Sequence, residues 1–287
     1  MEQIEDLTKY YRENGEPEEV VRMRNLITES FADLEFFEEG HRYVRHMKDG
    51  TDLELPSVSG VTHKFSPPFE EIPISENYAL KHGNTPEYWR DVWKMNNLVA
   101  TTSGTLTHEY GESVAWLKLN RPDKICDSCK PGYIKDKGWL IPTRNKEKAI
   151  LKFWCDMPEC YHVILPEARI YNFDGIQQPY AGTFDLGIYY RNDKNPSKSG
   201  FILMDYKTNG DLYNEYNATH NKRLLGGFSD MIDCSFSMYV LQLNLYQRAI
   251  ENIGIPVIDR RLIWLKDDCT YELVKVPDIQ DRIPLNF

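Results

Sequence analysis

Long apolar runs are missing from this 287-residue sequence. No stretch of about 18 consecutive apolar residues occurs, so the sequence predicts neither a membrane-spanning segment nor a membrane partner. The opening MEQIEDLTKYYRENGEPEEVVRMRN is charged throughout and lacks the apolar core of a secretory signal peptide. We therefore expect a cytoplasmic protein whose six cysteines are reduced.

Internal repeats, low-complexity tracts and an excess of basic residues are missing as well. Asp and Glu number 44 against 34 Lys and Arg, and the net charge of −10 argues against a protein that coats nucleic acid through bulk electrostatics. It does not exclude an enzyme acting on nucleic acid, because cation-binding carboxylates are themselves acidic and a basic groove can be local. The 41% hydrophobic and 27% charged content is typical of a globular protein with one large domain, or one domain with an insertion.

Four segments are predicted along the chain. Residues 1–35 form a helical lead-in with apolar residues at helical intervals, namely Ile4, Leu7, Tyr11, Val20, Val21, Met23 and Leu26. Residues 36–119 begin the main domain, with a strand pair over 36–48 whose turn is KDGT and two helices over 86–119, the second starting near Gly104. Residues 120–162 are polar, lack clean periodicity and are predicted to be an insertion that contains cysteines. Residues 163–287 complete the core.

The last segment reads mainly as β-structure. Strands are predicted over 163–173, 181–190 and 201–208, and the turn formers in RNDKNPSKSG join the last two as a hairpin. Residues 236–252 form an amphipathic helix that ends at Gly254 and Pro256, and a second hairpin follows over 260–277. The pattern predicts an α/β fold with a central mixed sheet flanked by helices.

The hairpin over 181–208 brings chemistry-bearing residues together. Folding it about its turn places Asp185 opposite Tyr206, within one residue, and therefore beside Asp205 and Lys207. Residues two apart on a strand point to the same face, so Asp205 and Lys207 share one. Such a pair is often a solvated face or a cross-strand ion pair. Here it follows the apolar run FILM, which indicates a central strand where charge is costly without a role.

Two carboxylates and one ammonium on a sheet suit a particular chemistry. Oxygen ligands hold hard cations such as Mg²⁺ or Mn²⁺, which polarise a phosphoryl oxygen and acidify a bound water. The ammonium of Lys207 then stabilises developing negative charge, or orients and helps deprotonate the water. The sequence therefore predicts Asp185, Asp205 and Lys207 as catalytic residues.

Five motifs in order resemble one family. They are PSVSGV (56–61), GTLTH (104–108), PEARIY with AGTFD (166–171 and 181–185), DYKT (205–208) and QLNLY (242–246). Together they resemble the PD-(D/E)XK nucleases, in particular the branch related to RecB, to phage exonucleases and to the mitochondrial genome maintenance exonuclease. The resemblance covers residues 36–277 and implies a restriction-endonuclease-like core in residues 36–119 and 163–287. It also suggests a bacterial or phage-infected host cell.

The resemblance also implies roles for individual residues. His108, Asp185, Asp205 and the backbone carbonyl of Tyr206 would bind the metal, and Lys207 would be the catalytic lysine. The roles of six further residues are open. Gln242 and Tyr246 would either steady Lys207 or the DNA, or simply pack, and Thr208 and Ser57 would contact DNA phosphate. Glu167 is either an outer-sphere carboxylate or a surface residue, and Glu112 either supports His108 or is a solvated charge.

Two cysteine pairs lie in the predicted insertion. Cys126-x-x-Cys129 has the spacing of a zinc knuckle, and Cys155 and Cys160 would complete a tetrahedral structural Zn²⁺ site, with His162 as an alternative ligand. Free thiols are the other main interpretation, and an iron–sulfur cluster fits the spacing poorly. The basic and aromatic residues of this segment would alternatively contact DNA.

The expected function is metal-dependent hydrolysis of DNA phosphodiester bonds, with Mg²⁺ or Mn²⁺ as cofactor. The resemblance favours an exonuclease acting in recombination, replication or repair on single-stranded DNA or DNA ends, with a replication or recombination protein as a possible partner. Three alternatives stay open: a structure-selective endonuclease, a non-catalytic member that binds nucleic acid or a partner, and an interaction protein organised by zinc.

Overall fold

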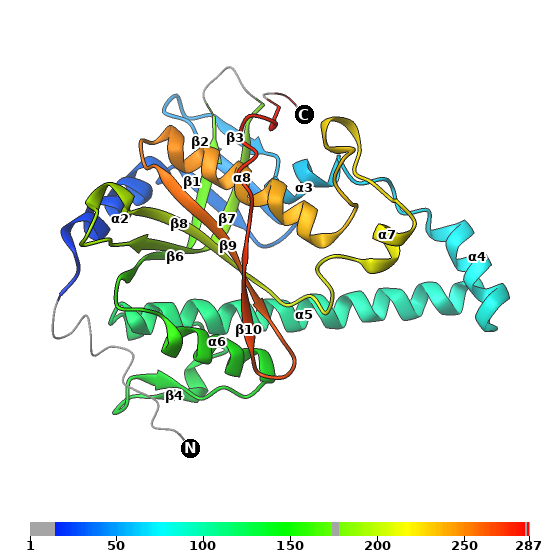
Figure 1. The fold of residues 1–287 in the computed structure, drawn as a ribbon, viewed down its shortest axis with the longest axis horizontal. Helices are drawn as coiled ribbons and strands as arrows, with labels where there is room; N and C mark the ends of the chain where they lie inside the picture. The colour runs from blue at the N-terminus through cyan, green and yellow to red at the C-terminus, as the bar shows by residue number, and fades with distance from the viewer. Residues whose placement is uncertain (1–14, 174–177, 285, 287) are drawn as a thin grey trace.

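A five-stranded mixed sheet forms the centre of the protein. A computed structural model of the chain describes residues 15–173, 178–284 and 286 (Figure 1). The sheet has the order β10-β9-β8-β7-β6, in which only β8 and β9 run parallel. Its strands are β6 (Tyr161–Asn172), β7 (Tyr180–Tyr190), β8 (Gly200–Lys207), β9 (Val257–Leu265) and β10 (Tyr271–Lys275). The α/β class and the mixed sheet are as predicted.

Helices cover both faces of this sheet. On one face α2 (Glu18–Ser30), α3 (Val58–His63) and α8 (Ser235–Asn252) share an apolar core with the strands. On the other face α5 (Pro86–Lys118) and α6 (Asn145–Asp156) pack on side chains such as Ile188 and Ile202 (Figure 1). Each face therefore buries its own core, and strand β8 is buried along its whole length.

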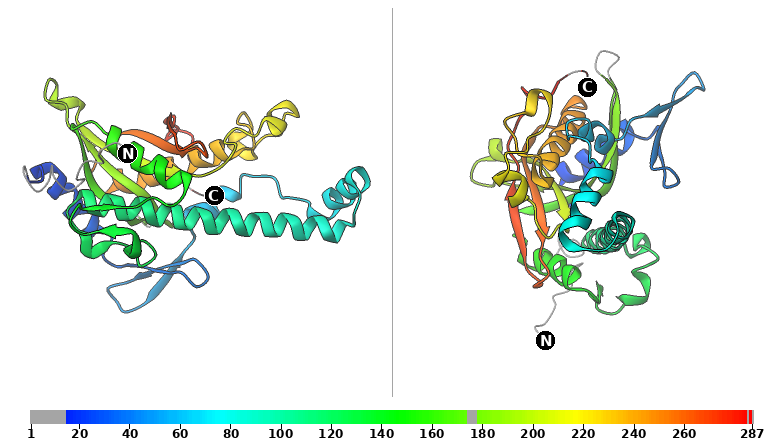
Figure 2. Two further views of the ribbon diagram at one scale, coloured as in Figure 1. Left: turned by 90° about the horizontal axis from the view of Figure 1, so that it is seen from below. Right: turned by 90° about the vertical axis from the view of Figure 1, so that its right-hand side faces the viewer.

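The predicted strand pair over 36–48 belongs to a second sheet. Strands β1 (Leu34–Phe37), β2 (Arg42–His46) and β3 (Asp52–Leu55) form an antiparallel sheet that projects from the main body (Figure 2). The turn between β1 and β2 is residues 38–41, whereas KDGT leads into β3, so the predicted turn was assigned to the wrong connection. Gly40 and His41 both have positive φ, which a tight turn requires.

The prediction of two helices over 86–119 is wrong, because α5 is one helix of 33 residues. The Thr85 side chain caps its first turn by accepting from the Tyr88 backbone N–H at 3.2 Å, and Pro86 occupies the first turn. Residues 94–102 are exposed on every face of the helix. They carry no buried apolar stripe, so the periodicity that predicts a helix fades before Gly104. The far end of α5 carries α4 (Glu71–His82) away from the sheet (Figure 1).

The segment predicted as an insertion contains a helix that is part of the core. In α6, Ile150, Phe153 and Trp154 are buried against α5 and the sheet. The remaining elements here are short: η1 (Pro122–Lys124), η2 (Lys130–Gly132), β4 (Tyr133–Ile134) and β5 (Trp139–Leu140). Strand β6 begins within the segment, two residues earlier than predicted.

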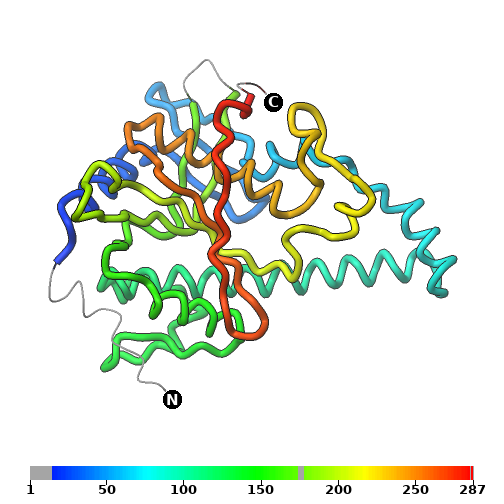
Figure 3. The backbone as a smooth tube through the Cα atoms, in the orientation of Figure 1, coloured from blue at the N-terminus to red at the C-terminus, as the bar shows by residue number. Residues whose placement is uncertain are grey.

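Other predicted elements agree with the structure. Helix α2 lies within the predicted lead-in and buries Val20 and Met23, while Ile4, Leu7 and Tyr11 are outside the described residues. Helix α8 is followed by Gly254 at φ 86°. Residues 208–234 link β8 to α8 and include α7 (Glu215–Thr219) and η4 (Gly226–Phe228); η3 (Pro196–Lys198) lies in the β7–β8 turn (Figure 3). Within the described segments, we find no helix with the length and apolarity needed to cross a bilayer.

Candidate active site

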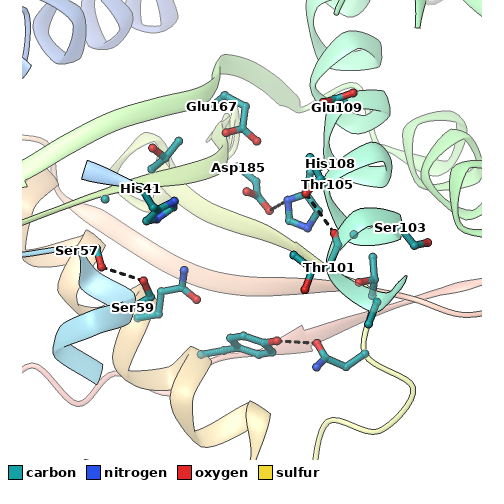
Figure 4. Close-up of a pocket in the computed structure, with 18 of the residues that line it drawn as sticks. His41, Ser57, Ser59, Thr101, Ser103, Thr105, His108, Glu109, Glu167 and Asp185 are labelled. Atoms are coloured by element: carbon teal, nitrogen blue, oxygen red, sulfur yellow. Dashed lines mark hydrogen bonds and ion pairs between the residues drawn. The ribbon is translucent and has the colours of Figure 1, made fainter. Parts of the chain in front are cut away.

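A cleft of about 1270 Å³ lies where both sheets meet α5 and α8. One wall is a stretch of α5 from Asn96 to Glu112, and the opposite wall comes from β1, β2 and the start of α3. The first half of β7, residues 208–210 directly after β8, and one face of α8 form the floor. The cleft therefore gathers side chains from segments far apart in the sequence (Figure 4).

The β7–β8 hairpin delivers Asp185 to this cleft. Leu186 pairs with Met204, so Asp185 lies level with Asp205, one residue from the predicted partner and inside the predicted margin. Asp185 Oδ2 accepts a hydrogen bond of 2.6 Å from the Tyr206 backbone N–H. This bond ties the carboxylate to the neighbouring strand and fixes its position.

Three potential metal ligands converge around Asp185. His108 from α5, Glu167 from β6 and Asp185 from β7 each offer a ligand atom, and these atoms lie within 4.8 Å of one another (Figure 4). His108 Nδ1 is 3.2 Å from Asp185 Oδ2. The sequence places His108 and Asp185 in one site, and the structure adds Glu167, whose role the sequence leaves open.

The backbone of Glu167 is unusual. Its φ of 47° lies in the left-handed region, although Pro166 and Ala168 on either side pair regularly with β7. A non-glycine residue held in the left-handed region costs about 1–3 kcal/mol, and such strained residues cluster at functional sites. No sequence pattern announces this conformation in a strand, which is why the role of Glu167 could not be assigned from the sequence.

Charge is concentrated in this cluster. Burial raises the pKa of Glu167 well above its ordinary value, and the charges of Asp185, Glu112 and Asp205 raise it further. Burial would also raise the pKa of Asp185, but the neighbouring His108 and Lys207 hold it below the ordinary value. Burial opposes protonation of His108, yet Asp185 raises the His108 pKa. A cation among these carboxylates would relieve their mutual repulsion.

Asp205 and Lys207 form a buried ion pair beside the cluster. Burial and the charge of Asp185 raise the pKa of Asp205 to about 6. Burial alone would lower the pKa of Lys207, but Asp205 and then Tyr239 raise it. Asp205 is not one of the three residues whose ligand atoms lie within 4.8 Å of one another, so its predicted role as a metal ligand stays a prediction.

Tyr239 on α8 is a residue that the sequence did not single out. Its ring centroid is 4.1 Å from Lys207 Nζ, and its hydroxyl donates to Asn209 Oδ1 at 2.6 Å. The ammonium therefore lies between a carboxylate and an aromatic face. Tyr239 precedes Gln242 by three residues on one helix, and this spacing on a shared face is the signal that could have found it.

The predicted supporting residues also line the cleft. Gln242 Nε2 donates to the Tyr246 hydroxyl at 2.9 Å. Ser57 caps α3 by accepting from Gly60 N–H at 3.0 Å, and the Thr208 carbonyl accepts from Lys146 Nζ at 2.5 Å. Glu112 accepts from Trp116 Nε1 at 3.0 Å and from the Cys126 thiol at 3.2 Å. Its contacts are thus with the cysteine-containing segment.

The structure does not bring the four cysteines of the predicted zinc site together. All six cysteines lie in described segments and are free thiols. In those segments, no three of Cys126, Cys129, Cys155 and Cys160 come within the 4.8 Å that groups His108 with Glu167 and Asp185. His162 is buried, and burial lowers its pKa.

The donor set defines the kind of site. Two carboxylates and one imidazole on separate rigid elements fit a divalent cation such as Mg²⁺ or Mn²⁺, which prefers oxygen ligands and accepts imidazole in the case of Mn²⁺. The residues therefore define an α/β protein with a candidate cation site in a polar cleft. Neither models of protein families nor the sequences of curated proteins give a match to this chain.

Proposed function

We propose that this protein is a nuclease that uses a divalent cation to hydrolyse phosphodiester bonds in DNA. The observation that supports this most is the meeting of His108, Glu167 and Asp185 in a cleft beside the Asp205–Lys207 pair. The order of sequence motifs points to the PD-(D/E)XK nucleases and their restriction-endonuclease-like core, and within them to an exonuclease.

Each side chain has a role in this proposal. His108, Glu167 and Asp185 hold the cation, which when bound polarises the phosphate and acidifies water. Lys207 keeps its proton, because the Asp205 charge raises its pKa. Its ammonium therefore stabilises negative charge that develops on the phosphate and does not accept a proton. Asp205 holds the ammonium in place, and Gln242 and Tyr246 present polar groups to the DNA strand.

End-labelled and circular single-stranded and double-stranded DNA, incubated with Mn²⁺ or with EDTA, test the proposal. We expect digestion of labelled ends with Mn²⁺ only, and its loss in Lys207→Ala. Lys198→Ala is the matched control, because Lys198 is exposed in the turn at the opposite end of the same hairpin. Digestion in EDTA, or full activity of Lys207→Ala, would refute the proposal. Cleavage of circles would indicate endonuclease action.

A further inference from the structure

Three aromatic rings cluster on the wall of the cleft opposite α5. The Phe36 ring lies 4.8 Å from that of Tyr43 and 5.0 Å from that of His41, and His41 lies 5.7 Å from Tyr43, each measured between centroids. Tyr43 is 3% exposed, Phe36 is half-buried and His41 is exposed. Tyr43 is thus the base of the cluster, and the other two rings present accessible edges and faces.

This aromatic cluster belongs to the same cleft as the candidate cation site. Phe36, His41 and Tyr43 line the cleft together with Glu167 and Asp185, and His41 lies on the side of Asp185 away from α5 (Figure 4). The Tyr43 hydroxyl lies 3.1 Å from Thr183 Oγ1, two residues before Asp185 on β7. The projecting β1–β2–β3 sheet is therefore fixed against the strand that carries the central carboxylate.

Arg169 adds a cation beside the rings. Its guanidinium carbon is 5.7 Å from the Phe36 ring centroid, and the residue is exposed on β6, two positions after Glu167. It makes no ion pair among the described residues, so its planar fork is open to an anion. A guanidinium on an aromatic ring commonly binds phosphate in this way.

We propose that Phe36, His41 and Arg169 form a subsite for one unpaired nucleotide next to the scissile phosphate. The base stacks on Phe36, the His41 ring, which stands at 81° to Phe36, contacts the edge of the base, and Arg169 binds the phosphate of the same nucleotide. A base in a duplex is already stacked between its neighbours, so this subsite selects single-stranded ends or overhangs. The inference rests on the proposed nuclease function. Glu38 lines the same part of the cleft, and its carboxylate would repel a phosphate that lies close to the β1–β2 turn.

A substrate series with one abasic residue at successive positions from the labelled end tests the subsite. With wild-type protein, the abasic residue should lower kcat/KM about 5- to 150-fold at one position, the range expected for loss of one base stack. Phe36→Ala should lower kcat/KM on intact DNA by a similar factor. In this variant the abasic residue should have no further effect, because the same interaction is already lost.

Matched variants separate stacking from folding. Phe36→Trp keeps a ring and should restore activity, whereas Phe37→Ala should behave like wild type, since Phe37 lies on the other side of β1 and does not line the cleft. Asparagine adopts the left-handed backbone conformation that position 41 has. His41→Asn should therefore lower kcat/KM without lowering the unfolding temperature. Arg169→Gln should mainly raise KM.

A binding measurement keeps the subsite and the nuclease function distinguishable. Single-stranded oligonucleotides with one 2-aminopurine are titrated into Lys207→Ala protein, and stacking on Phe36 should quench the fluorescence unless Phe36→Ala is also present. If neither the abasic residue nor Phe36→Ala nor His41→Asn changes the rate of digestion, the subsite is overturned and the nuclease function is kept. Quenching that depends on Phe36, with no digestion by wild-type protein, would support the subsite and overturn the nuclease function.

Discussion

The Lys207 ammonium has two neighbours that fix its position. Asp205 holds it by charge, and the Tyr239 ring lies against it at 4.1 Å from the centroid. A cation on a desolvated aromatic face gains about 2 kcal/mol, comparable to a good hydrogen bond. Tyr239 is therefore a positioning residue for Lys207 in the proposed reaction.

Replacing the Tyr239 ring should affect turnover more than substrate affinity. We expect Tyr239→Leu to lower kcat about 10- to 30-fold at nearly unchanged KM. The reason is that Lys207 loses roughly 2 kcal/mol of interaction with the ring and is no longer held in place. Tyr239→Phe keeps the ring, loses only the hydrogen bond to Asn209, and should retain most activity. Steady-state kinetics of both variants checks this. Equal losses in the two variants would show that the hydroxyl matters and the ring does not.

Glu147 stabilises the start of α6. Its Oε2 accepts from the backbone N–H groups of Thr143 at 2.5 Å and Arg144 at 3.0 Å, and its side chain is 6% exposed. Burial raises its pKa, but the Arg144 and Thr143 hydrogen bonds outweigh burial and lower the pKa below the ordinary value of 4.5. A depressed folded-state pKa stabilises the protein above about pH 4.5, and this contribution is lost as the pH falls through the folded-state value.

Glu147→Gln should therefore lower the free energy of unfolding by about 1–3 kcal/mol at pH 7, because the amide cannot accept all of these bonds. The difference from wild type should narrow as the pH falls from about 5 to about 3, since only the carboxyl titrates. Urea unfolding across this range measures it. A difference that stays constant with pH would contradict the assigned ionisation.

The residues of the site differ in how far the sequence reveals them. Asp185, Asp205 and Lys207 are predictable because strand alternation and a clear turn fix the hairpin register within one residue. Glu167 is not, because its role depends on a left-handed backbone within a strand. Tyr239 is predictable only in part: its spacing from Gln242 places it on the same helix face, but the pattern is the same whether its ring packs on apolar atoms or on an ammonium.

At the scale of elements, the approach of α5 to β8 depends on Gly111. A Cβ atom at this position would lie 2.7 Å from the buried Tyr206 ring, whose hydroxyl accepts a hydrogen bond from Trp154 Nε1 at 3.1 Å. The ring cannot move without breaking this contact. The helix can therefore lie this close to the strand only with glycine at position 111.

Gly111→Ala should destabilise the protein by about 1–3 kcal/mol, because overpacking outweighs the gain of about 1 kcal/mol in helix propensity. Gly104→Ala is the matched control on the same helix, since its Cβ would meet only Thr208 Oγ1 at 3.6 Å. It should leave stability unchanged or raise it by up to about 1 kcal/mol. Thermal unfolding of both variants decides; a stabilised Gly111→Ala would rule out the close contact.

Helices and strands were predictable where they bury one face. The apolar stripe of α8 indicates its type and its ends to within a residue or two, whereas β7 is buried on both faces and its end was indicated by the turn-forming residues that follow it. The continuity of α5 was not predictable, because residues 94–102 are exposed on all sides and have no buried apolar stripe that would mark a helix face packed on a neighbour. The three-stranded sheet was only partly predictable, since residues 38–51 contain two turns and only the second, KDGT, was recognised as one.

At the scale of the whole molecule, the net charge of −10 and the proposed substrate are compatible. Part of that charge belongs to the carboxylates of the cleft, and the proposed cation would offset it when bound. The rest of the proposed substrate contact uses few cations: Lys146 lines the cleft, Lys207 is buried next to Asp205, and Arg169 lies beside Phe36. Binding should therefore depend on local contacts and weakly on long-range attraction.

Calorimetric titration of Mn²⁺ tests the central claim, that Glu167 joins His108 and Asp185 in one cation site. We predict binding of one Mn²⁺ to wild type, and an affinity at least about tenfold weaker for Glu167→Gln. Glu76→Gln, at an exposed position of α4, should bind as wild type does. In EDTA, Glu167→Gln should unfold at a temperature no lower than that of the wild type, because the substitution removes a carboxylate that its neighbours repel. Wild-type Mn²⁺ affinity in a folded Glu167→Gln protein would contradict the account.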